Sequence, residues 1–271
     1  MGIRTQLRRL LAPIIGEAEP DPPPPAPPTL PHGADLFGDL AARLPHFRAT
    51  VVFDVGAHVG STARQYVQGF PEALIYCFEP VAATYSLLQA NLAAEARVRC
   101  FQLALGAGQG IGTMVLHGAP DTFYLAEAGQ RHVVHREAPR EAVQVARIDG
   151  FCAAEGIARL SYLKIDTEGA DLDVLHGAEG LLAAQRIDLV EVEAGMNPRN
   201  RWHVPLEVFK AYLEARGYFL FGLYEQCEEW PTGEPHLRRA NAVFVSAPTI
   251  EANRRSSETS PQGHSERSVA Q

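Results

Sequence analysis

The stretch VVFDVGAHVGSTA, residues 51–63, decides the fold of this chain. It begins with Asp54 set among four apolar residues, a run typical of a buried strand. Gly56 and Gly60 follow, and the sequence then takes on helical spacing as far as about Phe70. A buried strand that leads through a glycine-bearing turn into a helix is the opening unit of a parallel α/β sheet. We therefore predict a ligand site at this turn, because such sheets bind ligands beyond the carboxyl ends of their strands.

The rest of the chain alternates short β-rich runs with helical stretches. We predict further strands at residues 73–80, 98–105, 113–117, 142–148, 160–169, 186–194, 218–224 and 241–246, and further helices at 81–95, 171–184 and 205–217. Strands that alternate with helices indicate a mainly parallel sheet covered on both faces. The predicted fold class is therefore α/β, with a doubly wound, Rossmann-like sheet.

Composition divides the chain into four segments. Residues 1–19 combine apolar residues at helical spacing with arginines, as a basic amphipathic helix does. Such a segment can dock on a membrane surface or a partner, or it can be a frayed terminal helix. Residues 20–33 form a linker rich in proline. We expect the folded domain at 34–246 and a polar, disordered tail at 247–271.

The bulk composition excludes several classes of protein. The formal net charge of −8 argues against a nucleic-acid-binding protein, which needs a basic face. No apolar run approaches the roughly 18 residues of a membrane span. The four cysteines are scattered, as in reduced intracellular proteins. We expect a cytoplasmic protein, with residues 1–15 as the candidate contact with a partner protein or with the inner membrane surface.

The glycine turn differs from a dinucleotide fingerprint. Gly56 and Gly60 are spaced G-x-x-x-G, without the glycine that lets a backbone approach a pyrophosphate. Asp54, directly before the turn, would repel a pyrophosphate but attract an ammonium group. Glu79 ends the second strand 23 residues after Gly56, a spacing typical of an acid that binds ribose hydroxyls. These residues favour S-adenosylmethionine, a nucleoside that carries an amino acid, over NAD.

A second group of charged residues lies at the ends of later strands. Lys164 and Asp166 share one face of the strand at 160–169, and Glu168 lies near its carboxyl end. Glu191 and Glu193 end the next strand on one face. Carboxylates gathered at one edge could act as a general base, bind substrate hydroxyls or hold Mg²⁺. We assign no metal site, because carboxylate-rich clefts are common without one.

Four motifs in this order resemble the FkbM family of S-adenosylmethionine-dependent methyltransferases. They are VVFDVGAHVGSTA, IYCFEP (75–80), LKIDTEGADLDVLHGA (163–178) and IDLVEVE (187–193), and they extend over about residues 51–193. The resemblance implies a seven-stranded methyltransferase sheet with a reversed last strand. It also implies O-methylation of a hydroxyl on a sugar, a glycan or a natural product.

The resemblance further implies a cofactor site for S-adenosylmethionine. The methionine end would lie on Asp54, Gly56, Ala57 and Gly60, the ribose on Glu79, and the adenine beside Ala104 and Leu105. His58 occupies the position where the family loop usually has asparagine, and a histidine can still form a hydrogen bond with the cofactor there. Lys164, Asp166 and Glu168 match the family's second motif, for which the resemblance fixes no catalytic role.

Methyl transfer to a hydroxyl needs in-line positioning and a base for the departing proton. We predict that Asp166 or Glu193 is that base and that Lys164 sets its orientation or charge, with Glu168 as a fourth catalytic candidate. His203 is an alternative base on a loop near the cleft. His132 and His135 are weaker candidates in the insertion 106–141, which could shape the choice of acceptor.

Two other functions stay open at this point. An NAD-dependent oxidoreductase could use a similar sheet, although the missing G-x-G-x-x-G motif argues against it. A catalytically silent binding or scaffold protein could keep the same fold, although the retained acids in the turn and at the strand ends argue against silence.

Overall fold

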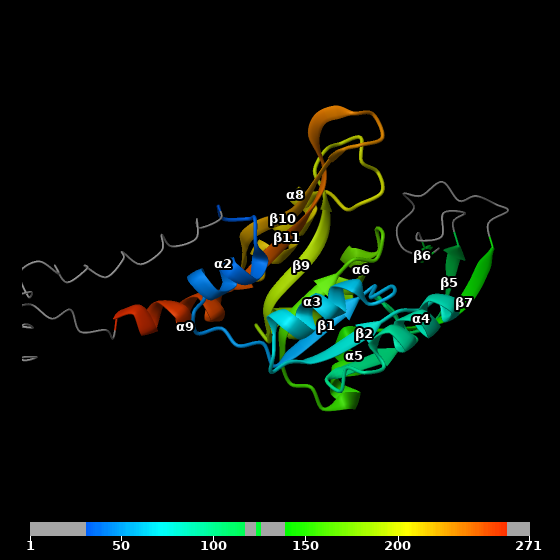
Figure 1. The fold of residues 1–271 in the computed structure, drawn as a ribbon, viewed down its shortest axis with the longest axis horizontal. Coiled ribbons are helices and arrows are strands. Elements are labelled where there is room, and N and C mark those ends of the chain that lie inside the picture. Colours follow the sequence, from blue (N-terminus) through cyan, green and yellow to red (C-terminus); the bar gives the residue numbers. More distant parts are fainter. Residues whose placement is uncertain (1–30, 117–122, 126–138, 259–271) are drawn as a thin grey trace, which may run out of the picture. The chain divides into compact units, whose positions relative to one another are not determined.

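The computed structural model describes residues 31–116, 123–125 and 139–258. Its main sheet has seven strands in the order β10-β11-β9-β8-β1-β2-β3 (Figure 1). They are β1 (Val51–Val55), β2 (Leu74–Phe78), β3 (Val98–Phe101), β8 (Leu160–Ile165), β9 (Ile187–Gly195), β10 (Tyr218–Glu229) and β11 (Glu234–Ser246). Strand β11 runs antiparallel to both of its neighbours, whereas β1 pairs in parallel with β2 and β8. The predicted doubly wound sheet with a reversed last strand is confirmed.

Strand β1 lies where the order of the sheet reverses. From β1 the chain builds β2 and β3 on one side, and it later returns to place β8 and β9 on the other side. A crevice opens beyond the carboxyl ends of the strands at such a point. The glycine turn after β1 therefore lies at the place where this fold binds ligands.

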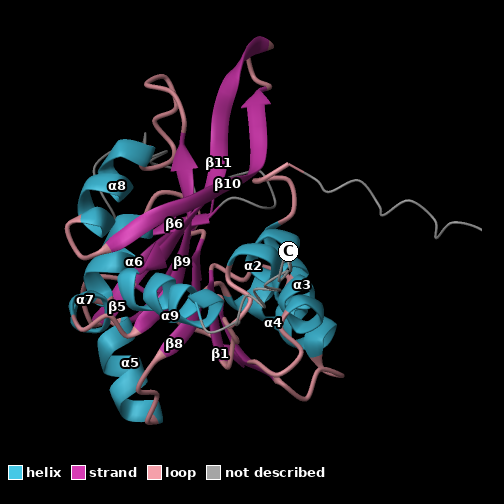
Figure 2. Ribbon diagram, turned by 90° about the vertical axis from the view of Figure 1, so that its left-hand side faces the viewer, coloured by secondary structure: helices cyan, strands magenta, loops and turns pink. Residues whose placement is uncertain are grey.

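Helices cover both faces of the main sheet (Figure 2). Helices α2 (Leu36–Arg43), α3 (Ser61–Gly69) and α4 (Ala82–Leu92) lie on one face, and α5 (Ile148–Glu155), α6 (Asp171–Gly177), α7 (Glu179–Ala183) and α8 (Leu206–Glu214) lie on the other. Successive side chains of β1 point to opposite faces of the sheet and so belong to two apolar cores. Val52 packs under α3 and α4, whereas Phe53 and Val55 pack toward α5 and α6. Asp54 points to the same side as Val52.

The predicted strand at 98–105 is divided in the structure. Strand β3 ends at Phe101, and β4 (Ala104–Leu105) joins a second sheet with the order β4-β7-β5-β6. The other members are β5 (Gly110–Leu116), β6 (Phe123–Leu125) and β7 (Arg140–Ala146). This second sheet places the Ala104–Leu105 segment beyond the end of β2. The rest of the 106–141 insertion, His132 and His135 included, falls largely outside the described residues.

The expected tail at 247–271 is wrong for its first part. Residues Ala247–Glu258 form helix α9. Ser246 caps the helix, because its Oγ accepts the N–H of Thr249 at 3.4 Å, and Ile250 packs against the apolar core on the side of the sheet that α2, α3 and α4 cover. The buried cap at Ser246 and the apolar contact of Ile250 thus stabilise a helix whose composition is otherwise polar. Residues 259–271, the expected segment 1–19 and most of the linker at 20–33 lie outside the described residues.

Strands β10 and β11 form a long hairpin whose far end projects from the body (Figures 1 and 2). The hairpin extends well past the predicted strands at 218–224 and 241–246. Within residues 31–116, 123–125 and 139–258, no helix has the length and apolar character required to cross a membrane.

Candidate functional site

A row of alternating charges crosses the centre of the main sheet. Asp54 of β1 lies in register with Lys164 of β8, which lies in register with Glu191 of β9. The Lys164 ammonium is 3.7 Å from Asp54 Oδ1 and 3.0 Å from Asp166 Oδ2. Both Lys164 and Asp54 are buried. Burial alone would lower the pKa of Lys164, but the carboxylates of Asp166 and Asp54 raise it, so the ammonium stays charged.

The ionised form of the buried Asp54 carboxyl group is stabilised by Lys164. Its side chain is fully buried, and neither carboxylate oxygen accepts a hydrogen bond within the described part of the chain. Burial raises the pKa of Asp54, and Lys164 opposes that rise. The sequence led us to expect that Asp54 attracts the ammonium group of a ligand. In the structure the ammonium that Asp54 meets is that of Lys164.

The turn after β1 is held against its two neighbouring strands. Both Gly56 N–H and Ala57 N–H donate to the carbonyl of Phe78, at 3.0 Å each. Gly56 has φ of 82°, and a Cβ there would lie 1.9 Å from the carbonyl oxygen of Asp166. Glycine is therefore required where the ends of β1 and β8 meet.

The next residue in the turn, His58, also adopts a left-handed backbone with φ of 49°. Asparagine and histidine are among the few residues that tolerate that region, so the exchange of one for the other keeps the turn. His58 N–H donates to Glu79 Oε2 at 3.2 Å. The turn is thus tied to the acid that ends β2.

Glu79 is a buried acid that lines a cleft. Its second carboxylate oxygen accepts the N–H of Val81 at 2.9 Å, and the side chain is 4% exposed. Burial raises the pKa of Glu79 to about 7, although the two backbone N–H groups oppose the rise. Any ligand that binds beyond β2 therefore faces a carboxyl group whose pKa lies near neutral pH.

A small cleft of about 230 Å³ lies over this turn. Five of the residues predicted to bind a cofactor line it: Gly56, His58, Glu79, Ala104 and Leu105. Asp54, Ala57 and Gly60 are not among its described lining residues, and Ala57 and Gly60 instead shape the turn behind it. Sequence reasoning missed the apolar walls supplied by Leu103 and Met114.

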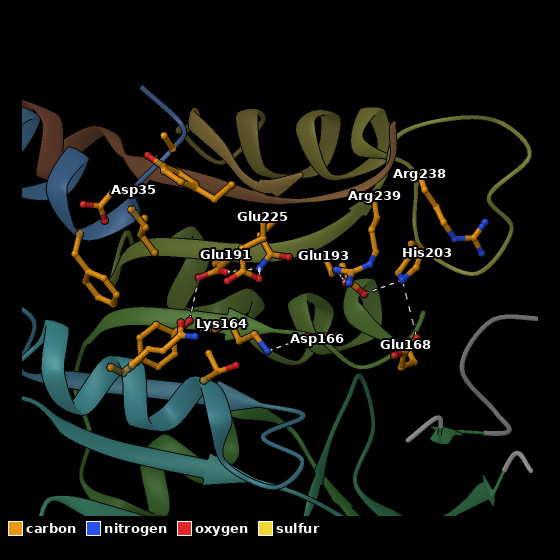
Figure 3. A pocket seen from close by; sticks show the side chains of 18 of the residues that line it. Asp35, Lys164, Asp166, Glu168, Glu191, Glu193, His203, Glu225, Arg238 and Arg239 are labelled. Atoms are coloured by element: carbon orange, nitrogen blue, oxygen red, sulfur yellow. Dashed lines mark hydrogen bonds and ion pairs between the residues drawn. The ribbon is translucent and has the colours of Figure 1, made fainter. Parts of the chain in front are cut away.

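A large cleft of about 750 Å³ opens beside the small one (Figure 3). The two clefts share Asp166 and Glu168. Both tryptophans of the chain, Trp202 and Trp230, line the large cleft. Its ionisable wall residues are Asp35, Tyr66, Lys164, Asp166, Glu168, Glu191, Glu193, His203, Tyr224, Glu225, Arg238 and Arg239.

Glu168 lies at the junction of the two clefts. It has a left-handed backbone, with φ of 53°, which is unusual for a glutamate and typical of strained functional turns. Trp202 Nε1 donates to its Oε2, while no described residue donates to its Oε1. Burial, followed by repulsion from Glu193 and Asp166, raises the pKa of Glu168. This carboxylate can accept a proton more readily than an ordinary glutamate.

The other predicted bases are engaged more tightly. Burial alone would raise the pKa of Asp166, but Lys164 at 3.0 Å lowers it overall. Glu193 binds Arg239 through Oε1 and lies 2.7 Å from His203 Nε2 through Oε2. Asp166 is therefore a weak base, and both oxygens of Glu193 already have cationic or imidazole partners.

His203 is buried, with both ring nitrogens in contact with side chains. Nε2 contacts Glu193, and Nδ1 lies 2.9 Å from the amide nitrogen of Asn200. Burial alone would lower the pKa of His203, but Glu193 raises it. The geometry makes His203 a group that orients Glu193, rather than a base with a free nitrogen.

Glu168, Glu193 and His203 also form the one group within the described residues with the donor set for a metal ion. One ligand atom from each lies within 4.8 Å of the others. Two carboxylates and an imidazole can hold a divalent transition metal. Arg239 and Trp202 already bind two of these carboxylates, however, so a cation would have to displace or share those contacts.

Three features of the large cleft were missed by sequence reasoning. Glu191 accepts hydrogen bonds from Tyr66, Tyr162 and Asn241, which come from three different elements. Asp35 comes from the segment before α2, and Glu225 comes from the β10–β11 hairpin. The alternation of side chains along β9 predicted the face on which Glu191 lies. No local sequence pattern predicts that Asp35 and Glu225 line the same cleft.

Comparison with known proteins gives a consistent set of matches. A sequence profile of the methyltransferase FkbM domain matches residues 54–220. The 2-O-methyltransferase NoeI of Sinorhizobium fredii is 26% identical over 151 residues, which cover 52% of this chain and 62% of NoeI. The hexuronic acid methyltransferase AglP of Haloferax volcanii is 25% identical over 152 residues, which cover 55% of this chain and 59% of AglP. The chain thus spans about three-fifths of the length of these relatives.

Among solved structures, precorrin-6y C5,15-methyltransferase from Geobacter metallireducens is similar over 78% of this chain and 87% of its own. The sequence identity is 12% and the TM-score is 0.41.

Proposed function

This chain belongs to the FkbM methyltransferase family, and on that premise we propose that it transfers a methyl group from S-adenosylmethionine to a hydroxyl of a saccharide or saccharide-bearing natural product. The observation that carries the proposal is the junction of the two clefts. A small cleft with an acid and an apolar wall meets a large polar cleft at Asp166 and Glu168. A methyl donor and a hydroxyl acceptor need such a shared boundary, because the reacting atoms must lie in line.

The small cleft fits the proposed cofactor. Glu79 offers a carboxylate to the ribose hydroxyls, and His58 borders the same end of the cleft. Leu105 and Met114 offer apolar surface for an adenine ring, as typical nucleotide sites do. When bound, S-adenosylmethionine would supply a methyl group attached to a positively charged sulfur.

The large cleft fits a saccharide. Trp230 is 72% exposed, and Arg238 lies over its ring at 5.7 Å. An exposed indole ring offers a flat apolar face and a polar edge, which suits the ring of a sugar. The carboxylates of the wall can accept hydrogen bonds from sugar hydroxyls. The name of AglP, a hexuronic acid methyltransferase, supports a saccharide acceptor, and the name of NoeI, a 2-O-methyltransferase, supports transfer to an oxygen.

We assign the proton-accepting role to Glu168. The acceptor oxygen would form a bond to the methyl carbon as the bond from that carbon to sulfur breaks, with the bonding electron pair left on the sulfur of S-adenosylhomocysteine. Glu168 Oε1 would take up the proton that the acceptor hydroxyl loses. Trp202 holds the other oxygen of Glu168, which fixes the direction of the carboxylate. Lys164 keeps Asp166 ionised at the same boundary, where a negative charge favours the approach of a sulfonium. Arg239 and His203 hold Glu193 as part of the acceptor wall.

Titration calorimetry with S-adenosylmethionine and S-adenosylhomocysteine tests the cofactor half of the proposal. We expect saturable binding that Glu79→Gln weakens by roughly tenfold to a hundredfold, because a charge-assisted hydrogen bond is lost. Glu72→Gln is the matched control, since Glu72 is exposed and lies before the opposite end of the same strand.

Detection of S-adenosylhomocysteine release with a panel of oligosaccharides tests the transfer itself. Cofactor binding without turnover on any hydroxylated acceptor would favour a silent binding protein. Absence of binding to S-adenosylmethionine and to NAD alike would favour a scaffold role.

A further inference from the structure

The charges that line the large cleft are unevenly matched. Six carboxylates line it, from Asp35, Asp166, Glu168, Glu191, Glu193 and Glu225, against the three permanent cations Lys164, Arg238 and Arg239. Each of these cations is already engaged by a carboxylate. Lys164 lies between Asp54 and Asp166, Arg239 binds Glu193, and Arg238 lies 2.7 Å from Glu229. No unpaired lysine or arginine of the described wall remains for an acidic acceptor.

The remaining carboxylates gather at the end of the cleft away from Glu168 (Figure 3). Asn241 Nδ2 donates to Glu191 Oε1 at 2.9 Å and to Glu225 Oε2 at 3.0 Å, so one neutral amide holds two acids together. In the described part of the chain, neither Glu225 nor Asp35 forms an ion pair with a cation. We name Asp35, Glu191 and Glu225 the acidic end of the cleft.

An irregularity in the backbone of the hairpin sets the position of Glu225 in the cleft. The register of β10 against β11 shifts between Tyr224 and Cys227, and Glu225 has a left-handed φ of 45°. A bulge of this kind redirects a side chain at the cost of regular pairing. Two like charges held within reach of one amide repel each other, and a cation between them would remove that repulsion.

Glu168, which the large cleft shares with the small cleft, lies at the opposite end of the same cleft, and the other shared residue, Asp166, lies between the two ends beside Lys164 (Figure 3). The cleft also presents the indole rings of Trp202 and Trp230, which suit the body of a sugar. An acceptor could therefore place a hydroxyl at one end and a positive group at the other while its rings lie between them.

We propose that the acceptor is an amino-bearing saccharide, whose protonated amine binds the acidic end while a hydroxyl lies at Glu168. This inference rests on the proposed function and narrows its acceptor class. It disfavours acceptors that carry carboxylates, such as uronic acids, because they would meet excess negative charge without a free cation. Specificity thus arises from repulsion of acids as well as from attraction of amines.

Calorimetry of the S-adenosylhomocysteine-loaded protein with three tetrasaccharides of similar length tests the charge preference. The probes are tetraglucosamine, tetra-N-acetylglucosamine and tetragalacturonate, at a pH at which the amine is protonated. We expect tetraglucosamine to bind most tightly and tetragalacturonate most weakly. The double variant Asp35→Asn, Glu225→Gln should weaken the binding of tetraglucosamine by roughly tenfold or more and leave that of the acetylated probe unchanged.

Glu228→Gln is the control for the variant, because Glu228 is exposed on the same hairpin and does not line the cleft. Equal or tighter binding of the acetylated or acidic probe, no binding of any probe, or a double variant with unchanged preference would overturn the inference. The same titrations on cofactor-free protein, with S-adenosylhomocysteine titrated separately, distinguish its failure from failure of the proposed function. Absence of cofactor binding, with the charge preference among the probes intact, would overturn the proposed function. Loss of the charge preference, with cofactor binding intact, would overturn only the inference.

Discussion

The two clefts that meet at Asp166 and Glu168 differ in how the chain builds them. The small cleft takes its polar groups from short motifs at the ends of β1, β2 and β8, and backbone N–H groups hold Glu79, the one acid that it does not share with the large cleft. The large cleft takes its groups from α2, β9, the loop before α8 and the β10–β11 hairpin, and side chains hold one another. The small cleft is thus fixed by the ends of strands, which suits a constant cofactor. The large cleft is assembled from residues far apart in the sequence, which suits a particular acceptor.

The largest expected effect is at the boundary between the clefts. Glu168→Gln keeps the shape of the side chain but removes the base, so we expect kcat to fall by roughly 10²–10⁴. The affinity for S-adenosylhomocysteine should stay close to that of the unchanged protein. Steady-state kinetics and calorimetry on the same preparation measure both quantities. A larger loss of kcat in Asp166→Asn than in Glu168→Gln, with the cofactor still bound, would move the base to Asp166.

The buried charge row should dominate stability beneath both clefts. Lys164→Met leaves the Asp54 carboxylate buried without a cation, so we expect a loss of about 3–5 kcal/mol in the free energy of unfolding. The double variant Asp54→Asn, Lys164→Met should regain much of that loss, because no unpaired charge remains. Urea denaturation measures the free energy of unfolding of the unchanged protein, of Lys164→Met and of the double variant.

Lys210→Met serves as the matched surface control for that experiment. Lys210 pairs with Glu214 one turn later on α8, and such an exposed pair contributes roughly 0.5 kcal/mol at most. Similar losses for Lys164→Met and Lys210→Met would show that the buried row is not a structural element.

The smallest expected effect is a pH dependence confined to the small cleft. The pKa of Glu79 is raised to about 7. In the proposed complex, the ribose hydroxyls would donate hydrogen bonds to its ionised form. Cofactor affinity should therefore be constant above about pH 7 and fall by at most about tenfold per pH unit below it, as the carboxyl group takes up a proton. The fall ends below the pKa of Glu79 in the complex. Glu79→Gln should flatten the profile, and an unchanged slope in that variant would assign the titration to another group.

Much of the small cleft could be predicted from the sequence. Gly56, His58 and Glu79 lie at the ends of the first two strands, and parallel strands bring their carboxyl ends to one edge. The same logic predicted the doubly wound sheet and placed Lys164 and Asp166 on one strand face. It did not show that Lys164 would neutralise Asp54, because strand register is set by pairing across the sheet.

The large cleft lay beyond such reasoning. Asp35 and Glu225 are 190 positions apart, and only the packing of α2 beside the β10–β11 hairpin brings them to one cavity. The bulge that aims Glu225 and the loop that carries Trp202 and His203 have no local signature. Helix α9 is an intermediate case, since Ser246 before Ala-Pro-Thr is a helix-start pattern, whereas our prediction of a disordered tail used only the polar composition.

The sequence by itself determined the parallel sheet, its switch point at β1 and the acids at the strand ends, because periodicity, turn chemistry and strand direction are local properties. The tertiary structure alone decided which of those acids is neutralised and which is exposed to both clefts. Lys164 lies against Asp54 and Asp166, and Arg239 and His203 hold Glu193. Glu168 lines both clefts, and Trp202 binds only one of its oxygens. Charge pairing depends on distances of a few ångströms between residues far apart in the chain, and only the folded arrangement sets those distances.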